Sequence, residues 1–76
     1  MKLYQIDFHH YFVEDALSVA ESVINYARLN DERVECRFIT GRGKIQLELI
    51  KLFKETYGLN PVIPMTNTGM VLVEVY

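Results

Sequence analysis

The sequence predicts a two-layer α/β domain in which a four-stranded sheet carries two helices on one face. Three stretches have the period-two alternation or the continuous apolar character of strands, and two stretches between them repeat apolar residues every three or four positions. The expected order is therefore strand, helix, strand, helix, strand, strand. Right-handed crossovers would place both helices on the same side of the sheet, which gives two layers.

The first half of the chain is expected to form a strand, a helix and a second strand. Residues 2 to 8 alternate apolar and polar side chains, as in a strand with one buried side. From Val13 the apolar spacing changes to three and four, which predicts an amphipathic helix of about 18 residues. Asn30 and Asp31 interrupt this spacing, and residues 33 to 39 alternate again, so a second strand follows.

The second half is expected to form a helix, a short edge strand and an interior strand. The helical spacing returns over residues 44 to 57, and Gly58 follows in the position that glycine favours past a helix end. The short apolar pair Val62-Ile63 lies between two prolines, as in an edge strand. Residues 70 to 75 are nearly all apolar, which favours an interior strand.

Composition limits the classes of function. Residues 1–76 are expected to form one domain, and the net charge of −2 argues against a protein that coats nucleic acid over its whole surface. A local basic patch is still compatible with that charge. Cys36 is the single cysteine and has no partner for an internal disulfide. No apolar run reaches the roughly 20 residues that span a bilayer, so we expect a cytoplasmic protein without a membrane anchor.

Two segments at the ends of the first two strands carry the groups that suit ligand chemistry. Asp7, His9 and His10 stand at the end of the first strand, and residues 40 to 44 follow the second. Open α/β sheets bind ligands at the carboxyl ends of their strands. If these two strands are parallel neighbours, an acid, two imidazoles, a guanidinium and two glycines meet at one edge of the sheet.

These segments resemble motifs of the small MutS-related (Smr) domain family. The run Ile6-Asp7-Phe8-His9 is similar to the family's Leu-Asp-Leu-His motif, and Thr40-Gly41-Arg42-Gly43 is similar to its Thr-Gly-x-Gly loop. The ending, residues 68 to 75, is similar to its Gly-x-x-x-Val-Glu-Leu finish. The resemblance covers nearly the whole chain. It implies the fold of the C-terminal domain of bacterial translation initiation factor three, in which the last strand is antiparallel and internal.

The resemblance also implies a function. Family members bind DNA or RNA, and several are nicking endonucleases, which would act here by hydrolysis or transesterification of phosphodiesters. Some members need a divalent metal such as magnesium and others do not, so no metal ligand or cofactor is assigned to this chain.

Two residues depart from the family's first loop. His10 stands where the family usually has glycine, and Phe12 stands where a threonine often caps the following helix. A histidine in a backbone conformation with positive φ costs about 1 kcal/mol, and a lost cap costs about the same. Such losses need compensation or reflect a changed role.

The family's chemistry assigns catalytic roles to Asp7 and His9. His9 would be a general base toward a water or a ribose hydroxyl, and the carboxylate of Asp7 would support the imidazole. The alternative is that Asp7 bonds the backbone of the next loop and His9 is a surface residue. Unless the strand has already ended, its alternation places Asp7 and His9 on one face and His10 on the other, so a metal site formed by all three would need a bend and is not expected.

The second loop is expected to bind phosphate. Gly41 and Gly43 let the backbone approach a ligand, the amides at the start of the helix form an anion site, and Arg42 and Lys44 add positive charge. The alternative is a plain strand-to-helix turn built from glycines. The predicted phosphate and nucleic-acid-binding residues are His10, Thr40, Gly41, Arg42, Gly43 and Lys44.

The sequence is compatible with three functions. The first is a nucleic-acid-binding Smr-like domain with nicking endonuclease activity on DNA or RNA. The second is a non-catalytic module that binds RNA, a ribosome or a protein through the same edge. The third is a small homo-oligomeric adaptor that associates through the first helix, where Val19, Val23 and Tyr26 widen the apolar stripe.

Overall fold

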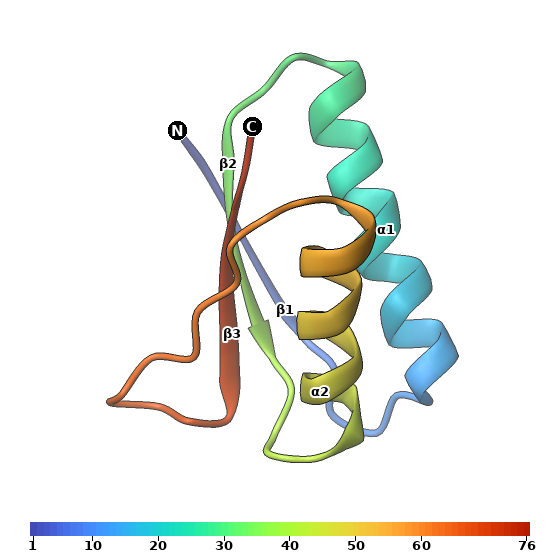
Figure 1. Cartoon of the computed structure of the whole chain (residues 1–76), viewed down its shortest axis with the longest axis vertical. Helices are drawn as coiled ribbons and strands as arrows, with labels where there is room; N and C mark the ends of the chain where they lie inside the picture. The colour runs from blue at the N-terminus through green and yellow to red at the C-terminus, as the bar shows by residue number, and fades with distance from the viewer.

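The computed structural model, which describes residues 1–76, has two layers: a three-stranded mixed sheet and two helices packed on one face of it (Figure 1). The elements in chain order are β1 (Lys2–Asp7), α1 (Val13–Leu29), β2 (Val34–Ile39), α2 (Lys44–Lys51), the π-helical turn η1 (Leu52–Thr56) and β3 (Met70–Val75). β2 lies in the centre, parallel to β1 and antiparallel to β3. The predicted α/β class and the antiparallel last strand are confirmed.

The core lies between the sheet and the helices. Every second residue of β2 and β3 is fully buried on the helix side, namely Val34, Cys36, Phe38, Val71, Val73 and Val75. The helix α1 buries Ala16, Ala20, Ile24 and Ala27, which follow the three-and-four spacing of one helix face. Small side chains at three of these four positions bring the helix close to the sheet. Neither helix combines the length and the apolar character needed to cross a bilayer.

The prediction of a fourth strand is wrong. Val62 forms a single bridge with Leu72, in which each backbone N–H donates to the other's carbonyl at 2.8 Å. The flanking Pro61 and Pro64 have no N–H to continue a ladder. β3 is therefore the edge of a three-stranded sheet, and not an internal strand as the resemblance implies. The bridge covers part of its outer side.

The second helix changes its hydrogen-bonding pattern near its end. The predicted helix over residues 44 to 57 is α2 up to Lys51 and then the π-helical η1. Gly58 follows with φ of +63°, a conformation that favours glycine. The backbone N–H of Leu59 then donates to the carbonyl of Phe53 at 2.8 Å. This closure buries the Leu59 side chain against the core.

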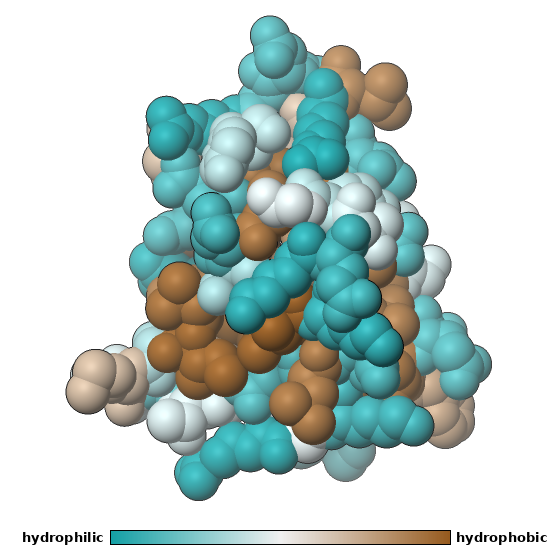
Figure 2. Space-filling model, in the orientation of Figure 1, coloured by the Kyte–Doolittle hydropathy of each residue, from teal (hydrophilic) through white to brown (hydrophobic).

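Some large apolar side chains stay exposed on the surface. Leu47 of α2 is 69% exposed, and Met65 in the loop before β3 is 96% exposed. Figure 2 shows that the apolar patches on this face of the molecule are interrupted by hydrophilic side chains. Scattered exposure of this kind is normal for a folded domain.

The buried thiol of Cys36 is expected to make stability depend on pH in the alkaline range. Burial, helped by the nearby Glu35 charge, raises the pKa of Cys36 from 9.0 to about 11. Between pH 9 and pH 11 the unfolded chain therefore loses a thiol proton that the folded chain keeps. Stability falls as the pH rises through this window, by about 2 to 3 kcal/mol once both states are ionised.

Urea unfolding at a series of pH values, followed by circular dichroism, measures this effect. The comparison is between the wild type and Cys36→Ala, because other groups titrate equally in both proteins. We expect the difference in unfolding free energy to be constant below pH 9 and to shift in favour of the variant toward pH 11. Parallel pH profiles would show that the thiol does not resist ionisation.

Candidate functional site

The ends of β1 and β2 lie side by side, as the sequence predicts. The register pairs Asp7 with Ile39, and the backbone N–H of Phe8 donates to the carbonyl of Ile39 at 2.9 Å. The turn after β1 and the loop after β2 consequently leave the sheet at the same edge, the lower end of the molecule in Figure 1. The segments that carry the predicted site residues therefore share this edge.

Asp7 bonds the main chain of the turn. Its Oδ1 accepts a hydrogen bond of 2.8 Å from the backbone N–H of His9, and it makes no hydrogen bond to either imidazole. Because β1 ends at Asp7, the strand alternation that was expected to reach His9 stops there. Asp7 thus holds the turn that carries the imidazoles, as in the alternative interpretation from sequence.

The two histidines lie together in this turn. His10 has φ of +67°, in the left-handed region. This is the conformation expected at this position, where the motif that the turn resembles has glycine. The ring centroids of His9 and His10 are 3.9 Å apart with an angle of 54° between the planes. These side chains would lie on opposite faces only if the strand continued, and β1 has already ended at Asp7. Both residues are exposed.

Thr40 and Gly41 hold the second loop to the start of β3. Their backbone N–H groups both donate to the carbonyl of Gly69 at 2.9 Å. The hydroxyl of Thr40 donates to the carbonyl of Gly41 at 2.8 Å. Gly41 has φ of +71°, which explains why glycine is needed at this bend. These groups already have partners within the protein, so they position the loop and are not free donors for a phosphate.

The donors that remain free lie just after this point. The backbone N–H groups of residues 42 to 46 make no hydrogen bond within the protein. The N-cap of α2, Gly43, has no capping side chain, and the first turn of α2 has no acidic residue. A helix start of this kind presents unpaired N–H groups and the positive end of the helix dipole.

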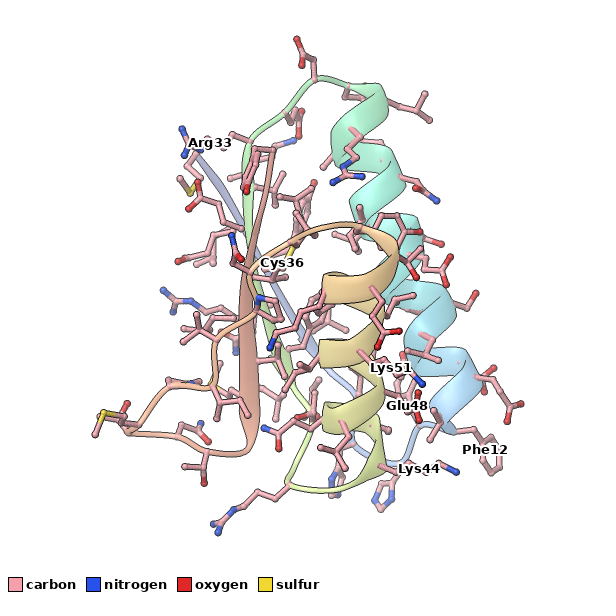
Figure 3. The ribbon with its side chains drawn as sticks, viewed as in Figure 1. Phe12, Arg33, Cys36, Lys44, Glu48 and Lys51 are labelled. Carbon is pink, nitrogen blue, oxygen red and sulfur yellow. The ribbon has the colours of Figure 1, made fainter.

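Arg42 and Lys44 add positive charge that no carboxylate neutralises. Figure 3 shows Lys44 at the lower end of α2, the end at which β1 and β2 finish. The ion pairs of the chain lie elsewhere and join Lys2 to Glu32, Arg33 to Glu74 and Arg37 to Glu35. Both Arg42 and Lys44 are exposed. Unpaired amides beside two unpaired cations are the groups that bind an anion at a helix start.

Gln46 supports this site and was missed by the sequence analysis. It is only 7% exposed, and its Nε2 donates to the carbonyls of Thr68 at 2.8 Å and Met70 at 3.2 Å. These two bonds fasten the first turn of α2 to the start of β3. The available signal was its position three residues before Leu49 on the buried face of the helix, where a polar side chain needs a partner.

The predicted site residues form an open surface and not a shared pocket. The surface has four hollows, and the predicted residues line none of them. The largest, of about 320 Å³, lies beside β1 and α1. No three His, Cys, Asp or Glu side chains are grouped so that they could hold a metal ion.

Comparisons with protein-family models, with curated proteins and with solved structures found no match to this chain. The resemblance to Smr domains therefore depends on the sequence motifs alone.

Proposed function

We propose that this chain is an Smr-like domain that binds the phosphates of DNA or RNA at the edge formed by the ends of β1 and β2. The observation that carries the proposal is the start of α2. There, Arg42 and Lys44 have no carboxylate partner and lie in a segment whose N–H groups, residues 42 to 46, have no acceptor.

The groups at this edge complement a phosphate in charge and in hydrogen bonding. The guanidinium of Arg42 can donate two parallel hydrogen bonds to phosphate oxygens, and the ammonium of Lys44 adds a point charge. A lysine in the first turn is unfavourable toward the helix dipole by roughly 0.3 to 1 kcal/mol. A bound phosphate would offset that repulsion as well as satisfy the free N–H groups.

The charge of the chain suggests that few phosphates are bound. Its net charge is −2, and three of its eight basic residues are already paired with carboxylates. With about two phosphates neutralised, the logarithm of the binding constant should fall with the logarithm of the salt concentration with a slope of only about −1.4 for a single strand and about −1.8 for a duplex. The open surface leaves room for a polymer to continue past the site on both sides.

Arg42→Ala is expected to weaken binding about tenfold. A charge-assisted hydrogen bond contributes about 1.5 kcal/mol, which corresponds to this factor. The salt slope should also become shallower by about 0.7 for a single strand or 0.9 for a duplex, because one phosphate contact is lost. Fluorescence anisotropy with labelled single-stranded RNA and duplex DNA of equal length, at several salt concentrations, measures both quantities.

Lys54→Ala is the matched control. Lys54 is an exposed cation without an ion pair, but it lies in η1, at the far end of the second helical segment from Lys44. Its removal should leave the affinity within about twofold of the wild type. An equal loss of affinity in Arg42→Ala and Lys54→Ala would mean that binding follows the overall charge of the protein. Binding that is insensitive to salt would exclude a phosphate site.

Cleavage of the bound phosphodiester is a second candidate function, and the paired imidazoles favour it. His9 and His10 lie with ring centroids 3.9 Å apart at the same edge as the proposed phosphate site. His9 would take a proton from water or a ribose hydroxyl, and the neighbouring imidazole of His10 would hold the phosphate. Asp7 contributes by fixing the turn through the backbone N–H of His9.

A further inference from the structure

The outer edge of β1 is open, whereas the opposite edge of the sheet is partly covered. The backbone N–H of Lys2 donates to Arg33 and that of Phe8 to Ile39, both on the β2 side. Because successive residues of a strand direct their backbone groups to opposite sides, the N–H and C=O of Leu3 and Gln5 point away from β2. Both residues are exposed.

β1 has none of the features that protect β3. β3 is bridged by Val62, and the prolines on either side of Val62 prevent further pairing. β1 contains no proline, and Lys2 is its single basic residue. Exposed strand edges without such protection pair readily with another extended strand.

An apolar groove runs beside this open edge. It has a volume of about 320 Å³ and is lined by Tyr4 of β1 and by Val19, Ser22, Val23 and Tyr26 of α1. No charged side chain is among these, and Tyr26 is 53% exposed. A strand added to β1 would direct every second side chain into this groove. The occupant must therefore be a strand in which every second residue is apolar.

We propose that the occupant is β1 of a second copy of this chain, paired antiparallel about a two-fold axis near Tyr4. β1 itself meets the requirement, since Tyr4 and Ile6 both lie on its helix side and alternate with Leu3 and Gln5. Its charge distribution selects the direction. Lys2 begins the strand and Asp7 ends it, so parallel pairing in register would set Lys2 beside Lys2 and Asp7 beside Asp7, whereas antiparallel pairing keeps these like charges at opposite ends.

The pairing is self-complementary in its geometry. With the axis at Tyr4, Leu3 lies opposite Gln5 of the other copy, and the outward N–H and C=O groups of these residues exchange hydrogen bonds. The two sheets become one, and both α1 helices stay on the same face. Val19, Val23 and Tyr26 of the two copies then meet across the axis. Arg42 and Lys44 follow β2, which takes no part in this pairing, so this inference is independent of the proposed function.

Light scattering over a range of protein concentrations tests the proposal on the full chain. The expected wild-type mass approaches twice the 8.9 kDa of the monomer. Gln5→Pro removes an outward N–H that β2 does not use, and Tyr26→Lys places a charge in the groove; both variants should be monomeric. The matched control is Leu47→Lys, which changes a 69% exposed apolar residue of α2 outside the groove and should leave the dimer intact.

Amide hydrogen exchange supplies a second measurement. Exchange at Leu3 and Gln5 should slow as the protein concentration rises, because these N–H groups are bonded in the dimer alone. If Gln5→Pro fails to fold by circular dichroism, Tyr26→Lys decides the question. A wild type that stays monomeric at every concentration would overturn the proposal, as would a dimer that persists in Tyr26→Lys.

Discussion

Phe38→Ala is expected to lower the free energy of unfolding by about 3 to 5 kcal/mol. Phe38 is fully buried on the central strand, and its ring stacks on Phe8 at a centroid distance of 5.4 Å and on Phe53 at 5.6 Å. These three rings connect the end of β1, β2 and η1 across the core. Domains have total stabilities of only about 5 to 15 kcal/mol, so we expect a large unfolded fraction in urea titrations followed by circular dichroism.

Phe12→Ala makes the same chemical change at a surface position. Phe12 is 75% exposed and contributes no side-chain cap to α1. Its truncation should change the unfolding free energy by no more than about 0.5 kcal/mol. Similar losses in the two variants would indicate that the aromatic stack does not hold the layers together.

The sheet could be predicted closely from sequence where one side of a strand is buried. Residues 33 to 39 and 70 to 75 were predicted, and β2 and β3 are Val34–Ile39 and Met70–Val75. Residues 33 to 39 were predicted from their alternation of apolar and polar side chains, and residues 70 to 75 from their nearly continuous apolar character. The same local signal predicted α1, whose buried alanines recur at helical spacing.

The parts of the fold that were not predicted depend on contacts distant in sequence. Val62 had a strand-like sequence, but whether it forms a ladder or one bridge depends on hydrogen bonds to Leu72 that its prolines limit. Gln46 appeared as an ordinary helix residue, although its side chain bonds carbonyls 22 and 24 residues away. Local periodicity contains no information about these pairings.

The candidate site, like the fold, was predicted in its overall placement but not in its detailed contacts. The sequence predicted two parallel strands joined by a helix, and the turn after β1 and the loop after β2 were therefore expected to meet at one edge of the sheet. The sequence left two roles open for Asp7, support of an imidazole or a bond to the loop backbone, because the choice depends on where β1 ends. The bonds of Thr40 were not predicted, because they depend on how the loop meets Gly69. Thus Asp7 bonds a backbone N–H, and Thr40 bonds the loop instead of remaining free.

Cleavage, the second function proposed, is expected to depend on His9. His9→Ala should lower the rate of cutting of supercoiled plasmid or single-stranded RNA by about 10² to 10⁴-fold, the usual contribution of a general base. Binding should change less than in Arg42→Ala, because the free N–H groups and cations at the start of α2 are untouched. Gel analysis of the products, with magnesium or with a chelator, measures the rate. Equal cutting by His9→Ala and the wild type would exclude this role.

Substitutions at Asp7 separate its two possible contributions. In Asp7→Asn an amide oxygen can still accept the 2.8 Å hydrogen bond from the backbone N–H of His9, so the turn is kept while the negative charge is lost. Because the carboxylate makes no hydrogen bond to either ring, we expect Asp7→Asn to cut nearly as fast as the wild type and Asp7→Ala to lose activity with the turn. If Asp7→Asn were as inactive as Asp7→Ala, the charge itself would support the imidazole. The catalytic pairing implied by the Smr motif would then be the correct one.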